Sequence, residues 1–236
     1  MYQAHLHRRE DYLIAGKSGL ETAVTLSTEI PKAWGKVPKD YDMLGKLVHV
    51  VKLFQENKIR FALIGGLALS EHALPRATKD VDFLVEDEDM EKARGLLENY
   101  YKEGNAEFML FDVDGVRMDL VAARLRLHKQ GITDAQLGKI EGVEVPVVSA
   151  RDLLLLKLIA AGDRQNPRAA LQDQADAASI LEHSRGLRSQ DVQYVADRIL
   201  EAFCYTQERL LKYRALLAWL NEVLEKLGRP EWKARI

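Results

Sequence analysis

Three aspartates are the residues in this sequence whose type and spacing suggest chemistry. Asp80 and Asp82 lie two residues apart at the start of a segment that has the character of a strand, and Asp119 lies in a second such segment. Because successive side chains of a strand point to opposite faces, Asp80 and Asp82 are expected to share one face. If both strands belong to one sheet and bury the same apolar face, all three carboxylates converge on the other face.

Such a convergence of carboxylates would favour the binding of a divalent cation. Three carboxylates that are brought together without a counter-charge repel one another, and Mg²⁺ or Mn²⁺ binds oxygen ligands of this kind. Two such ions can hold the attacking and the leaving oxygens of a phosphoryl transfer. The alternative is that Asp80 and Asp82 are solvated residues on an edge strand. An Asp-x-Asp pair is weak evidence by itself, because the pattern occurs elsewhere in the chain, for example at Asp112 and Asp114, where a turn is predicted.

Two further features could bind phosphate. Gly65 and Gly66 end one predicted strand and begin a helix, where backbone N–H groups can approach an anion without a Cβ in the way. A plain strand-to-helix turn would have the same sequence. Lys157 lies on the apolar face of a leucine-rich helix, where an ammonium without a partner is costly to bury. The alternative for Lys157 is a side chain that extends its charged end to water.

The elements that must position these residues are indicated by hydrophobic periodicity and turn residues. Helices are predicted at 41–58, 67–73, 87–101, 150–162, 168–184, 189–204 and 206–227, and strands at 61–64, 81–85, 107–113, 116–122 and 143–148. Asp114-Gly115 predicts a hairpin between two of the strands. The fold class is therefore α+β, a mixed β-sheet flanked by helices and followed by an all-helical C-terminal lobe. Three regions are expected: an N-terminal arm with one short helix (1–40), a core (41–150) and the helical lobe (151–236).

Charge and composition limit the possible functions. The 236 residues include 34 Lys and Arg against 36 Asp and Glu, a net charge of −2, which argues against a strongly basic nucleic-acid binder. Residues 61–150 carry 10 basic and 17 acidic side chains, a net of −7, so the acid is concentrated around the aspartates. The single Cys204 excludes an internal disulfide. Without a signal segment or a long apolar run, the chain is expected to be cytoplasmic and not to bind membranes.

The combined pattern is more specific than its parts. Gly-Gly-x-Ala from Gly65, followed by Arg-x-Thr-x-Asp-x-Asp ending at Asp82, resembles the nucleotidyltransferase superfamily with a polymerase-beta-like fold, and within it the AbiEii/AbiGii toxin-type branch. The resemblance covers about residues 45–185. Many superfamily members have Gly-Ser where this chain has Gly65-Gly66, which favours the AbiEii side.

The resemblance implies roles for particular residues. Asp80, Asp82 and Asp119 would be catalytic and hold the metal, and the nucleotide would be bound by Gly65, Gly66, Arg76, Thr78, Lys157 and Arg164. Asp173 and Asp176 would support Lys157 or line the pocket, although a solvated stripe on a helix would have the same spacing. Gln172 stands where the family has a lysine.

The implied activity is a Mg²⁺-dependent (or Mn²⁺-dependent) transfer of a nucleoside monophosphate from a nucleoside triphosphate to an acceptor hydroxyl, with release of pyrophosphate. The acceptor would be a tRNA end, as for toxin members, or a protein or a small antibiotic. A cognate antitoxin or toxin would be a partner. The alternative is a non-catalytic binding protein, antitoxin-like, that keeps the fold and acts through a partner. The sequence leaves the nucleotide, the acceptor and the effect of Gln172 open.

Overall fold

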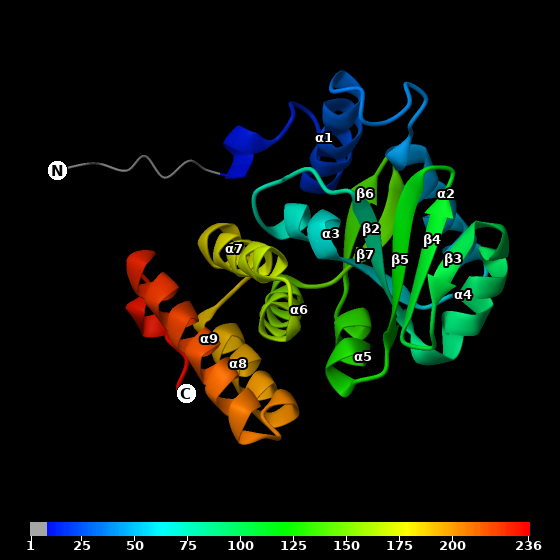
Figure 1. Cartoon of the computed structure of the whole chain (residues 1–236). Helices are drawn as coiled ribbons and strands as arrows, with labels where there is room; N and C mark the ends of the chain where they lie inside the picture. Colours follow the sequence, from blue (N-terminus) through cyan, green and yellow to red (C-terminus); the bar gives the residue numbers. More distant parts are fainter. Residues whose placement is uncertain (1–8) are drawn as a thin grey trace. The chain divides into compact units, whose positions relative to one another are not determined.

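The computed structural model describes residues 9–236 and divides the chain into two compact units (Figure 1). The first unit ends at Val148, and the second runs from Ser149 to Ile236. The first contains every strand of the described residues, and the second is helical. The predicted α+β fold class with an all-helical C-terminal lobe is confirmed.

The first unit is built on a seven-stranded mixed sheet in the order β3-β4-β5-β2-β1-β7-β6. The strands are β1 (Phe61–Ile64), β2 (Asp80–Glu86), β3 (Tyr101–Gly104), β4 (Phe108–Val113), β5 (Val116–Ala123), β6 (Gln136–Ile140) and β7 (Val143–Val147). β2 pairs antiparallel with β1 and parallel with β5, so the strand that carries Asp80 and Asp82 lies in the middle of the sheet. Asp80 and Asp82 therefore do not lie on an edge strand.

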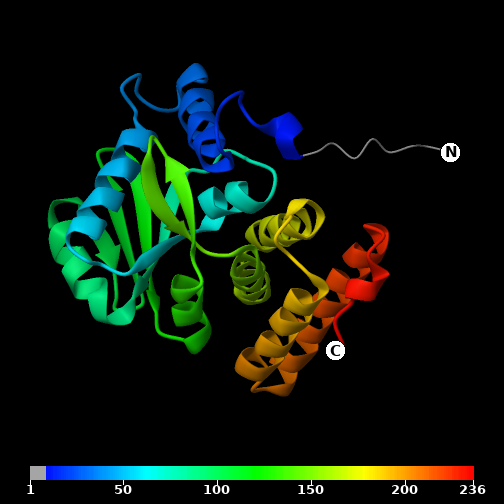
Figure 2. The ribbon, with the colours of Figure 1, turned by 180° about the vertical axis from the view of Figure 1, so that it is seen from behind.

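One face of β2 is the apolar core. Val81, Phe83 and Val85 are fully buried, as the alternation of side chains along a strand requires. Phe83 makes edge-to-face contacts with Phe61 of β1 and with Phe54, at ring-centroid distances of 5.7 and 5.6 Å. Phe54 belongs to helix α2 (Met43–Glu56), which lies across this face of the sheet (Figure 2). The remaining face of β2 is left for its two aspartates.

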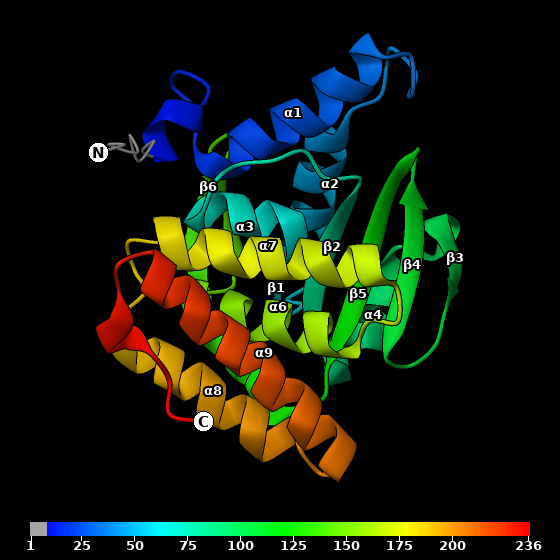
Figure 3. The same cartoon turned by 60° about the vertical axis from the view of Figure 1, so that its left-hand side comes forward.

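The other face carries helix α3 (Gly65–His72), which follows β1 directly (Figure 3). Helix α1 (Gly19–Ala33) is longer than the short helix expected in the arm, and it begins with a capping box between Ser18 and Glu21. Its side chains Leu20 and Ala23 are fully buried. Residues 1–8 of the expected arm lie outside the described residues. Segment 9–12 forms a single 3-10 turn, η1 (Arg9–Tyr12).

Two segments differ from the sequence prediction. The predicted helix 87–101 is divided into η2 (Asp87–Asp89), α4 (Met90–Leu96), η3 (Glu98–Tyr100) and β3. The chain leaves the helix because Tyr101 pairs with Phe111 across the edge of the sheet, with ring centroids 5.7 Å apart. Helix α5 (Arg126–Thr133) and strand β6 were not predicted. β6 is mostly exposed and contains Gly138, so it lacks the apolar alternation of a strand.

The second unit consists of α6 (Ala150–Asp163), α7 (Pro167–His183), α8 (Ser189–Phe203), α9 (Gln207–Lys226) and the turn η4 (Pro230–Trp232). The helices follow the predicted ranges closely, and Ser149, Asn166 and Thr206 each cap a helix N-terminus. In the described part of the chain, no helix combines the length and the apolar character that crossing a membrane requires.

Candidate functional site

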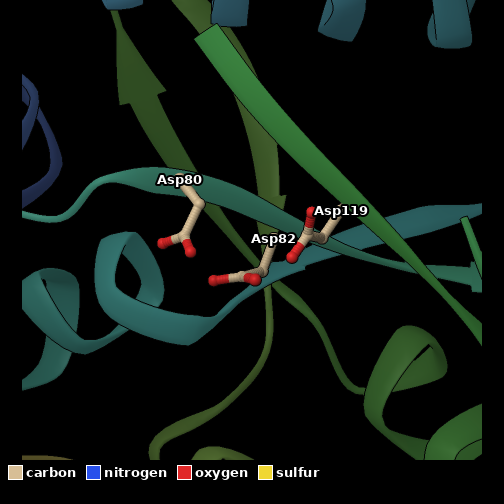
Figure 4. Close-up of side chains that lie close together, drawn as sticks. All are labelled: Asp80, Asp82 and Asp119. Atoms are coloured by element: carbon tan, nitrogen blue, oxygen red, sulfur yellow. The ribbon is translucent and has the colours of Figure 1, made fainter. Parts of the chain in front are cut away.

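Asp80, Asp82 and Asp119, here called the aspartate cluster, lie together on the face of the sheet opposite Phe83. Each offers a carboxylate oxygen, and these oxygens all lie within 4.8 Å of one another. Figure 4 shows the three side chains pointing toward one another from β2 and β5. The parallel pairing of these strands brings them together, because Asp82 and Asp119 are register partners.

The surroundings of each carboxylate differ. Asp119 is only 6% exposed, whereas Asp80 and Asp82 are partly exposed. The hydroxyl of Thr78 donates a hydrogen bond to Oδ1 of Asp80 at 2.9 Å. The cluster is therefore open to solvent on the side of β2 and closed on the side of β5.

Gly65 allows Asp82 to lie against the start of α3. Its φ is +67°, a conformation that residues with a side chain rarely adopt. A Cβ at this position would lie 1.9 Å from Oδ2 of Asp82. A Cβ on Gly66 would lie 2.9 Å from the hydroxyl of Thr78 and 3.5 Å from Nη1 of Arg76. The two glycines therefore admit side chains of the 76–82 segment to the N-terminal turn of α3.

Arg117, which is not among the residues predicted from the sequence, is a neighbour of the aspartate cluster. It donates to both oxygens of Asp119, from Nε to Oδ1 at 2.9 Å and from Nη2 to Oδ2 at 2.8 Å. These hydrogen bonds raise the pKa of Arg117 above its ordinary value, and the charges of Asp119, Asp80 and Asp82 act in the same direction. The signal for Arg117 was present in the sequence, since a residue two before Asp119 on a strand shares its face.

The cluster fits a divalent cation of the Mg²⁺ or Mn²⁺ type. Its donors are carboxylate oxygens only, which are the ligands these hard ions take. Three carboxylates that lie this close together repel one another. A cation bound there would supply positive charge that offsets this repulsion.

The remaining predicted residues form a separate group in the second unit. Nζ of Lys157 lies 3.0 Å from Oδ1 of Asp173 and 2.7 Å from Oδ2 of Asp176. Arg164 pairs with the other oxygen of Asp173, and Gln172 donates to Asp176 at 2.9 Å. The side chain of Lys157 is 10% exposed and that of Arg164 is 51% exposed. Asp173 and Asp176 are therefore buried partners of Lys157 and not a solvated stripe.

Comparison with known proteins places this geometry in a family. The family model described as nucleotidyl transferase AbiEii toxin, type IV TA system, matches residues 52–236. That range includes the aspartate cluster, both glycines, and the Lys157 group. No curated protein sequence matches the chain.

Solved structures show a related fold. An antigenic nucleotidyltransferase-like protein from Paracoccidioides brasiliensis is 16% identical, with 81% of this chain and 94% of that protein covered and a TM-score of 0.50. The antibiotic-resistance factor ANT(2'')-Ia is 14% identical, with 78% of this chain and 97% of that protein covered and a TM-score of 0.48. At 16% identity, the first likeness speaks for the fold alone.

Proposed function

The chain belongs to the AbiEii family of nucleotidyl transferase toxins, and from this membership we propose that its aspartate cluster is the centre of a Mg²⁺-dependent or Mn²⁺-dependent nucleotidyl transfer. The family makes the chain an enzyme of the nucleotidyltransferase type. The observation that carries the metal-dependent mechanism is the convergence of three carboxylate oxygens within 4.8 Å.

In the proposed reaction, the acceptor oxygen attacks the α-phosphorus of a nucleoside triphosphate. A new P–O bond forms, the bond between the α-phosphorus and the bridging oxygen breaks, and pyrophosphate leaves with the electron pair. Asp80, Asp82 and Asp119 would hold the divalent ions, which when bound neutralise the charge on the phosphates and orient the reacting oxygens. Asp119 accepts the proton of the acceptor hydroxyl. Catalysis then consists of positioning and charge neutralisation.

In the first unit, the triphosphate would be bound at the start of α3. Gly65 and Gly66 present backbone N–H groups at the start of α3, and Arg76 and Thr78 shape this turn. In the second unit, Lys157 is engaged by Asp173 and Asp176, whereas Arg164 is half-exposed. Of these two residues, for which the family resemblance implies nucleotide binding, Arg164 is therefore the more accessible, and Lys157 is held by its two carboxylates.

The family description as the toxin of a type IV toxin–antitoxin system supports a cognate antitoxin as a partner. For the acceptor we propose a macromolecular hydroxyl, that of a tRNA end or of a protein. The test is to incubate the chain with each labelled nucleoside triphosphate, Mg²⁺ or Mn²⁺, total RNA and lysate protein. We expect label on RNA or protein only when the divalent ion is present.

Asp80→Asn is the decisive variant, because it removes the charge of one proposed ligand at nearly constant size. Asp114→Asn is its matched control: Asp114 lies at the hairpin turn with a φ of +50°, and Asn-Gly suits that turn as well as Asp-Gly does. We expect label transfer to fall by at least about 100-fold for Asp80→Asn and to persist for Asp114→Asn. Equal labelling by Asp80→Asn and the unmodified chain would refute the proposal.

A further inference from the structure

Helix α1 is connected to the segment that precedes Asp80 by a buried hydroxyl. Ser27, on α1, is 1% exposed. Its Oγ accepts a hydrogen bond from the backbone N–H of Thr78 at 2.9 Å and donates one to the carbonyl of Ala23 at 2.7 Å. The second bond orients the hydroxyl, so that its lone pair faces Thr78. Ser27 thus fixes the backbone of Thr78 relative to α1.

Thr78 is also hydrogen-bonded to the aspartate cluster. While its backbone is held by Ser27, its own hydroxyl donates to Oδ1 of Asp80 at 2.9 Å. A hydrogen bond to one oxygen of a carboxylate restricts rotation of the group and so sets the direction of the other oxygen. The space beside the hydroxyl is limited by Gly66, whose missing Cβ would lie 2.9 Å from it. Thr78 therefore connects α1 to Asp80 through two successive hydrogen bonds.

The N-terminal segment also holds the other end of the loop between α3 and β2. Arg9 donates to the carbonyls of Ser70 and Ala73, at 2.7 and 2.9 Å, at the end of α3. The N–H of Leu20 donates to Glu71 at 3.1 Å. A Cβ on Gly19 would lie 1.9 Å from the carbonyl oxygen of Ser70, so α1 and α3 are in close contact. Residues 73–80 are thus anchored at both ends by a segment that precedes the family match, which begins at residue 52.

We propose that Ser27 is a positioning residue for the metal site, and that α1 orients the carboxylate of Asp80 through Thr78. The proposal rests on the proposed function, because it assumes that Asp80 is a metal ligand. Residues that orient metal ligands change metal affinity by about 10- to 100-fold when they are removed. Ser27→Ala leaves the N–H of Thr78 without its partner and is expected to weaken Mn²⁺ binding by about 10-fold.

The experiment measures the Mn²⁺ dissociation constant of the full chain by electron paramagnetic resonance, for the unmodified chain, Ser27→Ala and Thr25→Ala. Thr25 is the matched control, because its hydroxyl makes the same type of bond to the carbonyl four residues earlier, Glu21, and accepts its other hydrogen bond from Lys17 instead of from the loop. Mn²⁺ binding is also measured for Thr78→Val and for the double variant Ser27→Ala/Thr78→Val, which together with Ser27→Ala form a double-mutant cycle. If Ser27 acts through the hydroxyl of Thr78, Ser27→Ala has little further effect once Thr78 is valine.

A second measurement does not depend on metal. In the metal-free chain, hydrogen exchange of the amides within residues 74–79 is expected to accelerate in Ser27→Ala and not in Thr25→Ala. This comparison tests whether Ser27 holds the loop even if Ser27→Ala binds no Mn²⁺. Unchanged Mn²⁺ affinity in Ser27→Ala or Thr78→Val, or additive effects of the two, would overturn the role of Ser27. Failure of the unmodified chain to bind Mn²⁺ would overturn the proposed function as well, so the two failures are distinguishable.

Discussion

The guanidinium of Arg117 and the carboxylate of Asp119 form a two-point ion pair on the face of β5 that carries the aspartate cluster. Both carboxylate oxygens accept a hydrogen bond, at 2.9 and 2.8 Å, and the side chain of Arg117 remains half-exposed. The guanidinium of Arg117 therefore occupies the same carboxylate oxygens that a metal ion bound at the aspartate cluster would use. Asp119 itself is held by the surrounding sheet, because β5 is paired on both sides.

Arg117→Gln is expected to tighten Mn²⁺ binding. The substitution removes a competing positive charge, and half-exposed ion pairs of this kind contribute up to about 1 kcal/mol, which corresponds to about fivefold in the dissociation constant. Arg117→Lys keeps the charge without the two-point geometry and serves as the control. Titration with Mn²⁺ at neutral pH measures the effect. Weaker binding in Arg117→Gln would show instead that Arg117 positions Asp119.

Gly65→Ala is expected to displace Asp82. The new Cβ would lie 1.9 Å from Oδ2 of Asp82, and the positive φ adds backbone strain. We expect a loss of about 1–2 kcal/mol in the free energy of unfolding together with weaker Mn²⁺ binding. Gly142→Ala is the matched control, because Gly142 also has a positive φ but no atom within 4 Å of the Cβ position. Gly142→Ala should lose stability without losing Mn²⁺ affinity; equal Mn²⁺ affinity in both variants would contradict the role of Gly65.

Lys157→Met tests the buried ion group of the second unit. Removal of the ammonium leaves the carboxylates of Asp173 and Asp176 buried without their main counter-charge, although Arg164 still pairs with Asp173. We expect the free energy of unfolding to fall by about 3 kcal/mol, at the low end for a broken buried pair. Urea denaturation followed by circular dichroism measures this loss.

The control for Lys157→Met is Lys233→Met, which breaks an exposed pair with Glu225 at 2.7 Å. Exposed pairs contribute at most about 1 kcal/mol. Similar losses in the two variants would mean that burial of the Lys157 group adds nothing to stability.

Stability is expected to fall below pH 6.5 because of His72. Burial lowers the pKa of His72, although Nε2 donates to the carbonyl of Val148 at 2.6 Å. A lowered pKa means that the folded chain binds fewer protons than the unfolded chain below about pH 6.5, the ordinary value for histidine. The free energy of unfolding therefore decreases as the pH falls, by up to about 1.4 kcal/mol per pH unit for each such histidine.

Burial also lowers the pKa of His128, so His72→Gln should remove only part of the pH dependence. Urea denaturation between pH 7.5 and 5.5 gives the slope, and His49→Gln, at an exposed position, is the control. The same slope in His72→Gln and the unmodified chain would contradict the assignment.

The strands that carry the aspartate cluster could be predicted because their signals are local. Val81, Phe83 and Val85 alternate with Asp80 and Asp82, so the sequence alone separated a core face from a polar face. The helices of the second unit likewise have local signals in their apolar periodicity, and Ser149, Asn166 and Thr206 cap their N-termini in the structure. The nucleotidyltransferase fold was recognised from one short motif, and the family match confirms it.

The segments 101–104 and 136–140 could not be predicted as strands. Each lies at an edge of the sheet and pairs only with the next strand along the chain, and their own side chains are largely exposed. An edge strand of this kind has little apolar alternation, because it buries little surface.

The sequence by itself determined which residue types were available for chemistry and which face of each strand they would occupy, because these follow from periodicity along a single element. Only the tertiary structure decided which of them meet. The parallel register of β2 and β5 places Asp82 beside Asp119, and the packing of α1 brings Ser27 to Thr78 across 51 residues of chain. Such contacts depend on the pairing and packing of distant segments, which no local pattern encodes.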